Sequence, residues 1–271
     1  MPDADSQRSA PAWLGLLAGL LSGLLGIGGG LVVSPALVLR GLPIRRATGT
    51  ALAVVLPVAC VAVLTELVIA VEQLHWWLAL AIALGGQLGA QLGARVLRVL
   101  PEAALRAAFI GLLLYAATRN LGLFGDLPGV ADQVWQVTGT PRYLAALGLG
   151  VLAGICAVLF GVGGGVVVVP GLVLLLGGLP IREAMATSLL AMIPTAAAGL
   201  RIAWRDGRVE GPTLRGLFLP ALGGAVLGVS ARNFVLEPTH LAQAFGVFLL
   251  YVAWRLRPFG GSPDPRLPRK S

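Results

Sequence analysis

Two glycine-rich interruptions lie inside hydrophobic stretches of this chain, 135 residues apart. The first is Gly26-Ile27-Gly28-Gly29-Gly30 and the second is Gly161-Val162-Gly163-Gly164-Gly165. Because glycine has no side chain, its backbone can turn sharply and approach a ligand closely. A short apolar segment follows each interruption, and the free N–H groups at the start of such a helix carry partial positive charge that favours anions. The pattern therefore predicts an anion site formed by Gly28, Gly29, Gly30, Gly163, Gly164 and Gly165.

A proline follows each interruption, Pro35 after the first and Pro170 after the second. Proline has no N–H, so the carbonyl groups of Leu31 and Val166, four residues earlier, lose their helical partners. These carbonyls then need another donor, such as a water molecule or a neighbouring side chain. We therefore expect each short helix to be weakened at its proline.

Three hydroxyl residues, Thr50, Thr187 and Ser188, lie about one turn into the segment that follows each short helix. Hydroxyl groups donate hydrogen bonds at a modest desolvation cost, so all three are candidate contacts for an anion. The alternative is that they bond a carbonyl one turn back or hold neighbouring helices together. The sequence leaves both interpretations open.

Few other polar groups stand within the apolar segments. Glu66 is the one acid well inside a long segment, and an intramembrane carboxylate is a candidate proton carrier. Its position near a segment end, close to Glu72 and His75, favours a solvated interfacial group instead. Gln87 and Gln91 share a helix face, where they either line a polar path or pack on another helix.

No pattern in the chain indicates an enzyme. Cys60 and Cys156 both lie in apolar segments, and no spacing of Cys and His fits a metal site. There is no GxxxxGK[ST] motif for ATP, and the first glycine run lacks the strand–turn–helix context of a dinucleotide site. We expect no metal, no cofactor and no catalytic residue.

The composition, 57% apolar and 12% charged, indicates a membrane protein. Soluble domains carry about 25% charged residues, and half that fraction cannot cover a globule of this size. Several runs are long enough to cross a bilayer core, for example 47–65, 76–94 and 184–200. The net charge of +8 fits Lys and Arg gathered in cytoplasmic loops, and nucleic-acid binding is not expected because basic and aromatic residues are not interleaved.

The chain divides into two similar halves. Pro43-Ile44-Arg45 matches Pro180-Ile181-Arg182, and Thr50 and Pro57 match Thr187 and Pro194. We expect a first membrane repeat at 12–120, a connecting loop at 121–141 that is rich in turn-forming residues, a second repeat at 142–257, and a cytoplasmic tail at 258–271.

Each half holds five apolar segments, the first two of them short. They lie at 12–27, 30–41, 47–70, 75–95 and 103–120, and at 142–160, 165–177, 184–204, 212–231 and 239–256. The two short segments of each half form either two tilted helices, a re-entrant hairpin, or one kinked helix. The total is therefore eight to ten segments in an all-α polytopic membrane protein.

The distribution of Lys and Arg favours five segments in each half. With the N-terminus inside, this arrangement places 16 Lys and Arg on the cytoplasmic side and 4 outside, whereas four crossings in each half give 12 and 8. The larger asymmetry obeys the positive-inside rule. An odd number of segments inverts the second half relative to the first, which is the plan of many secondary transporters, and it places both termini in the cytoplasm.

The doubled motif resembles that of the sulfite exporter TauE/SafE family of membrane permeases. The resemblance rests on Gly28 to Pro35 and Gly163 to Pro170, followed by Ala47-Thr48-Gly49-Thr50-Ala51-Leu52 and Ala184-Met185-Ala186-Thr187-Ser188-Leu189. The second copy departs from the first in having Ala186 where Gly49 stands. The resemblance covers about 12–257 and implies a multi-pass protein of the cytoplasmic (inner) membrane that moves small anions, often sulfite or organosulfonates.

These observations predict a secondary transporter of a small anion, such as sulfite, an organosulfonate or a related sulfur oxyanion, which works by alternating access between two inverted repeats. The alternative is a membrane scaffold or assembly subunit without transport. The expected partners are the anionic solute and the lipid bilayer. A homodimer through the small-residue stripes at Gly85, Gly89 and Gly93 or at Gly224 and Gly228 is a further candidate, although such stripes most simply form close-packing faces.

Overall fold

The computed structural model describes residues 11–96, 139–174 and 179–255, together with seven single positions between 107 and 121. All regular elements among these residues are helical. The expected segment at 103–120 and loop at 121–141 lie largely outside the described residues, and the expected tail at 258–271 lies wholly outside them.

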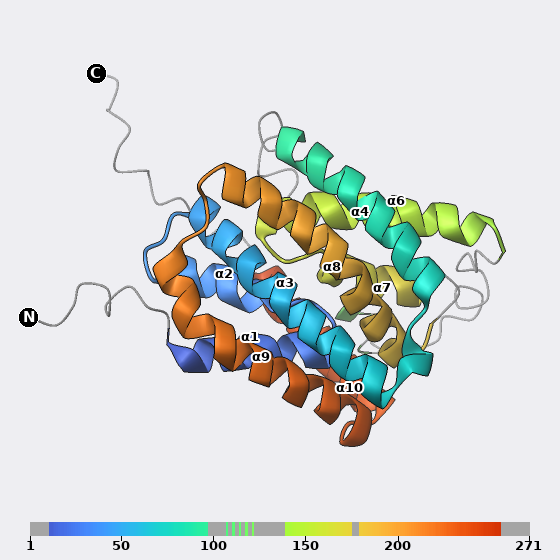
Figure 1. Cartoon of the computed structure of the whole chain (residues 1–271). Helices are drawn as coiled ribbons and strands as arrows, with labels where there is room; N and C mark the ends of the chain where they lie inside the picture. Colours follow the sequence, from blue (N-terminus) through green and yellow to red (C-terminus); the bar gives the residue numbers. More distant parts are fainter. Residues whose placement is uncertain are drawn as a thin grey trace, which may run out of the picture.

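The described parts of both halves have the same order of elements (Figure 1). The first half contains α1 (Ala12–Leu25), α2 (Gly30–Leu39), α3 (Ile44–Ile69), the 3₁₀ helix η1 (Val71–Gln73) and α4 (Trp76–Val96). The second half contains α6 (Pro141–Phe160), α7 (Gly165–Leu174), α8 (Ile181–Arg205), α9 (Gly211–Phe234) and α10 (Pro238–Arg255). Each half therefore has a helix, a glycine break, a 10-residue helix and a long helix of 25 or 26 residues.

Within the described ranges, five helices are long and apolar enough to cross a membrane, namely α3, α4, α6, α8 and α9. Their outward faces are apolar as well. On α4, Leu80, Leu84, Leu88 and Leu92 recur every four residues and are 41–54% exposed, which forms one apolar stripe along the helix. Such a stripe is stable against lipid and costly against water. The prediction of a multi-pass helical membrane protein is confirmed.

The chain reverses direction at each glycine break. A Cβ atom on Gly29 would lie 2.6 Å from the carbonyl oxygen of Ala18, which precedes Gly29 by 11 residues. A continuous helix would place these residues about 16 Å apart. The second half repeats the arrangement, because a Cβ atom on Gly164 would lie 2.9 Å from the carbonyl oxygen of Ala153. Each pair of short helices is thus a hairpin, and the alternative of one kinked helix is wrong.

The glycine stripes join helices from different halves of the chain. Gly224 and Gly228 of α9 lie directly on the backbone of α1, whose Gly15, Gly19 and Gly23 lie on α9 in turn. Gly85, Gly89 and Gly93 of α4 lie on the backbone of α6. In both cases the contacts advance in the same direction along the two helices, so each pair is parallel. The expectation of close-packing faces is confirmed, and a homodimer through these stripes is excluded because they are covered within the chain.

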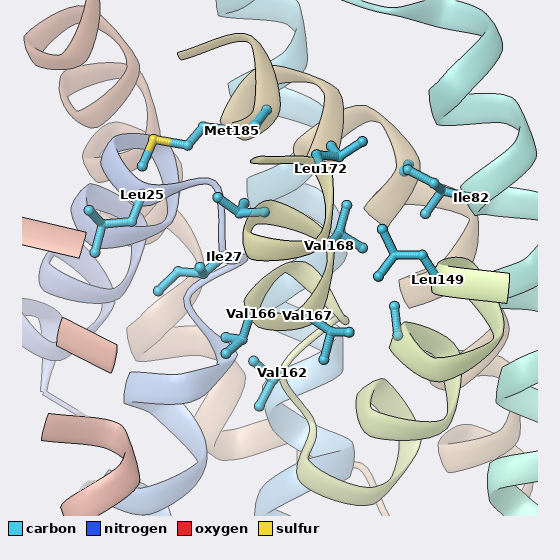
Figure 2. Packing of buried hydrophobic residues seen from close by; sticks show 14 of the residues in the cluster. Leu25, Ile27, Ile82, Leu149, Val162, Val166, Val167, Val168, Leu172 and Met185 are labelled. Carbon is cyan, nitrogen blue, oxygen red and sulfur yellow. The ribbon is translucent and has the colours of Figure 1, made fainter. Parts of the chain in front are cut away.

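The molecule consequently has two helix bundles, each completed by a helix of the other half. One hydrophobic core joins α1, α2 and α3 with α9 and part of α8. A second joins α6, α7 and α8 with α4, α10 and the residues around the first glycine break (Leu25, Ile27 and Leu31). Figure 2 shows the second core, in which Val168 of α7 lies toward Leu149 and Ile82, while Val166 lies beside Val162 and toward Ile27. The bundles meet along α3 and α8, which lie at the centre of the molecule.

Helices α3 and α8 run antiparallel. Thr50 near the start of α3 bonds Glu210 just after the end of α8, and Thr187 near the start of α8 bonds His75 just after the end of α3. The two long helices therefore present equivalent positions from opposite ends of the molecule, and both glycine breaks lie between them.

Candidate functional site

Both breaks consist of glycines in the left-handed conformation. Gly26 and Gly161 end α1 and α6 with φ of 68° and 69°, and their N–H groups donate to Ser22 and Ala157. Gly28 and Gly29 follow with φ of 77° and 65°, and Gly163 and Gly164 follow with 75° and 89°. Residues with a Cβ atom adopt this conformation only with strain. The glycines are thus required for the turn itself.

The two breaks lie directly against each other. A Cβ atom on Gly30 would lie 2.1 Å from the carbonyl oxygen of Gly161, and one on Gly165 would lie 2.6 Å from that of Gly26. Real Cβ atoms do not come this close to backbone. The third glycine of each triplet therefore permits close approach of the opposite break, and the structure brings together all six glycines of the predicted site.

Two apolar side chains cover the breaks from the central helices. A Cβ atom on Gly28 would lie 2.3 Å from Met192 Sδ and 3.0 Å from Val55 Cγ1, and one on Gly163 would lie 2.7 Å from both of these atoms. Val55 stands five residues after Thr50, and Met192 stands five after Thr187, so the two occupy matching positions. Sequence reasoning missed this pair, although the matching prolines two positions later marked the register.

The breaks carry N–H groups without acceptors. The carbonyl of Gly29 accepts the N–H groups of Val32 and Val33 at the start of α2, and that of Gly164 accepts those of Val167 and Val168 at the start of α7. The N–H groups of the middle glycines themselves donate to no described residue; these are Gly28, Gly29, Gly163 and Gly164. A buried N–H without a partner is costly, so four of them in one place call for a bound acceptor.

The prolines fall inside the short helices as expected. Pro170 lies within α7, and the backbone of α2 is helical through position 35. Each short helix nevertheless runs on for several residues beyond its proline. The expected weakening is therefore limited to the one hydrogen bond that each proline cannot form.

The predicted hydroxyl residues divide into two groups. Thr50 Oγ1 accepts the Glu210 N–H at 3.0 Å and Thr187 Oγ1 accepts the His75 N–H at 3.2 Å, and both threonines are fully buried. These bonds fix the residues that precede α9 and α4, as the helix-joining interpretation expects. Ser188 instead reaches a break, because its hydroxyl donates to the carbonyl oxygen of Gly26 at 3.0 Å.

Two other polar residues take specific partners. Gln87 donates to the carbonyl of Pro194 at 3.3 Å and thereby joins α4 to α8. Glu66 is fully buried, and its carboxylate lies 2.5 Å from Nη2 of Arg232 on α9. The expectation of a solvated Glu66 is wrong, because a counter-charge 166 positions away in the sequence lies beside it. Among the described residues, no three Cys, His, Asp or Glu side chains form a metal-binding group.

A protein-family model described as sulfite exporter TauE/SafE matches residues 2–120 and 146–270, and so includes both breaks and nearly the whole chain. The chain belongs to the sulfite exporter TauE/SafE family. This TauE/SafE protein is also 26% identical to a probable membrane transporter protein of Methanocaldococcus jannaschii over 244 residues, which is 84% of this chain and 87% of the relative. No solved structure matches it. It is a membrane transporter and not an enzyme.

Proposed function

We propose that this transporter carries a small anion, with sulfite, an organosulfonate or a related sulfur oxyanion as the substrate, and that the anion binds between the two glycine breaks. The observation that carries the proposal is the group of four buried N–H groups without acceptors, at Gly28, Gly29, Gly163 and Gly164. They lie at the start of α2 and α7, where helix dipoles add positive potential.

Backbone N–H groups suit an oxyanion in a membrane because they bind it without placing a formal cation in lipid. Ser188 turns its hydroxyl from the Gly26 carbonyl to the anion. Thr50 and Thr187, the other two predicted hydroxyl contacts, support the site indirectly, because their hydroxyl groups already bond the residues that precede α9 and α4. Selection among sulfur oxyanions then depends on the size of the space between Val55 and Met192.

In the described conformation the space between the breaks is closed. A Cβ atom added at Gly28 would collide with Met192, so no room is left there for an anion. Transport therefore requires Val55 and Met192 to leave the breaks. We propose that the two bundles rock against each other along α3 and α8 and open the breaks to each side in turn. The antiparallel α3 and α8 support inverted repeats, and the charge distribution supports cytoplasmic termini in the inner membrane.

The alternative is a membrane scaffold that does not transport. A scaffold needs the glycines only for packing and leaves the unpaired N–H groups without a purpose. A homodimer, if it forms, uses faces other than the glycine stripes, which are filled within the chain. Neither transport nor the proposed site depends on a second copy.

The deciding experiment is release of sulfite from loaded liposomes that contain the purified protein. We expect faster release than from empty liposomes, loss of release in Gly29→Leu, and normal release in Gly223→Leu. Gly223 is the matched control because a Cβ atom there meets no atom within 4 Å. Absence of release for every member of a panel of sulfur oxyanions, sulfonates and carboxylates, with a protein that elutes as a single species, refutes the proposal.

A further inference from the structure

A group of buried charged and amide side chains lies at the end of the molecule where α3 ends and α8 begins. Arg232 and Glu66 are both fully buried and form an ion pair at 2.5 Å. The Asn233 amide lies 3.4 Å from both carboxylate oxygens of Glu66 and accepts a hydrogen bond from Gln73 at 3.0 Å. Arg182, in the first turn of α8, donates to the carbonyl of Leu236.

The group holds two guanidinium groups and one fully buried carboxylate. Glu66 pairs with Arg232, whereas Arg182 donates to the Leu236 carbonyl, four residues beyond Arg232, and forms no ion pair with a described residue. Glu183 lies 2.6 Å from His75 instead, and Glu72 and Glu237, the sequence neighbours of Gln73 and Leu236, are exposed. Arg182 is half-buried and makes no ion pair with a described acid, which favours a further anion beside it.

Unused hydrogen-bond donors point to the same conclusion. Nε and Nη1 of Arg232 and Nε of Arg182 are buried and have no partner among the described residues. Buried polar atoms in native proteins are nearly always hydrogen-bonded, and exceptions indicate a bound molecule or a functional role. Guanidinium donors of this kind are suited to the oxygen atoms of an oxyanion.

The group lies close to the first glycine break. Met185, which packs directly on Gly26, follows Arg182 by three residues, or about 4.5 Å of helix. Thr187 connects the two regions, since its hydroxyl bonds the N–H of His75 and the carbonyl of Gln73. Arg182 thus lies about one turn along α8 from the residue that packs on Gly26, and about 15 Å along α8 from Met192, which covers the proposed transport site.

We propose that Arg232 and Arg182 form a second anion-binding site, which receives a small oxyanion at this end of the transporter and delivers it to the first glycine break. When no anion is bound, the carboxylate of Glu66 forms the ion pair with Arg232 in its place. The proposal rests on the proposed transport of anions. The matching position of Glu66 in the other half is Ala203, so the site makes the two ends of the transporter unequal.

The test measures the binding of sodium sulfite and sodium sulfate to the full chain in detergent by titration calorimetry, with ionic strength held constant by sodium gluconate. Arg232→Gln alone leaves Glu66 buried without a partner and is expected to unfold. The informative variants are therefore Glu66→Gln, which removes the internal competitor, and the double variant Glu66→Gln/Arg232→Gln, which removes the charge pair together. Glu183→Gln is the matched control, because that acid lies on His75.

We expect Glu66→Gln to bind sulfite more tightly than the wild type, the double variant to bind about tenfold more weakly than Glu66→Gln, and Glu183→Gln to bind as the wild type does. A purely structural ion pair predicts instead that sulfite affinity is the same in the wild type, Glu66→Gln and the double variant. That result, or no binding of either anion to the wild type, overturns the proposal.

The same proteins in liposomes separate this proposal from the proposed function. Gly29→Leu, or Gly29→Ala if the larger substitution does not fold, is expected to retain sulfite binding at the arginines while it loses release. Binding that depends on Arg232 without any release in the wild type refutes transport and leaves the second site standing. Release in the wild type with unchanged affinity in the double variant refutes the second site and leaves transport standing.

Discussion

Replacement of Gly30 by alanine tests whether the two glycine breaks meet as described. Gly30 is the first residue of α2, where alanine is otherwise favoured over glycine by up to about 1 kcal/mol. The new methyl group would lie 2.1 Å from the carbonyl oxygen of Gly161. Backbone cannot rotate out of the way as a flexible side chain can, so the two breaks must separate.

The size of the effect follows from that distance. The closest contacts that real Cβ atoms make are 3.0–3.4 Å, so the breaks must part by roughly 1 Å. Overpacking of this kind costs about 1–3 kcal/mol. Gly165→Ala strains the same contact from the second break, because its Cβ atom would lie 2.6 Å from the carbonyl oxygen of Gly26. The double variant should therefore cost less than the sum of the two, because one separation relieves both collisions.

Gly211→Ala is the matched control. Gly211 is likewise the first residue of a helix, α9, but a Cβ atom there meets nothing within 4 Å. We expect Gly211→Ala to be neutral or stabilising and Gly30→Ala to be destabilising when both are unfolded with SDS in mixed micelles and followed by circular dichroism. In liposomes, Gly30→Ala should lose most sulfite release, because it displaces the N–H groups of the site.

Equal stability of Gly30→Ala and Gly211→Ala would refute the direct contact between the breaks. Strict additivity of Gly30→Ala and Gly165→Ala would refute it independently, since residues that do not share an interface add within about 0.5 kcal/mol.

Further expectations concern the central helices, the topology and the glycine stripes. Thr187→Val should lower stability by about 1 kcal/mol because it leaves the half-buried N–H of His75, the residue before α4, without its acceptor. Thr187→Ser should restore the stability, and a neutral valine variant contradicts the assignment. Cysteines placed at the exposed residues near Arg45 and near Arg182 should react with an impermeant maleimide from opposite faces of the membrane. Reaction from one face would mean that the repeats are parallel. Gly19→Ala should destabilise by about 3 kcal/mol or more because its methyl group lies 1.9 Å from an α9 carbonyl, whereas Gly223→Ala on an open face should be neutral; similar Tm values for both would refute the packing of α1 on α9.

Local chemistry explains why the breaks were predictable. A run of glycines inside an apolar stretch already implies left-handed backbone and close approach, and Gly28, Gly29, Gly163 and Gly164 all have positive φ. The same holds for the small-residue stripes, since a repeat of four along a helix defines a face without knowledge of its partner. The family followed from the doubled motif.

The partners of these local features were not predictable. The glycine stripe on α1 packs on α9, and the stripe on α4 packs on α6. Each helix bundle therefore contains one helix from the other half of the chain. No local sequence pattern specifies which helices pair. The sequence left open whether the Thr187 hydroxyl contacts an anion or joins helices, and the structure places the His75 N–H beside it. Glu66 was misjudged because Arg232, the residue that compensates its charge, stands in the other half of the chain.

Sequence alone determined where the backbone of this protein must turn, which helix faces pack closely, and that the chain spans a membrane. Each of these properties depends on residue type and on spacing within a few helical turns. Only the tertiary structure decided that the two breaks touch, that Val55 and Met192 cover them, and that Glu66 is buried against Arg232. The breaks and the charged pair join residues more than 100 positions apart, and each of Val55 and Met192 covers the break of the other half as well as its own. Such distances exist only once the helices have packed.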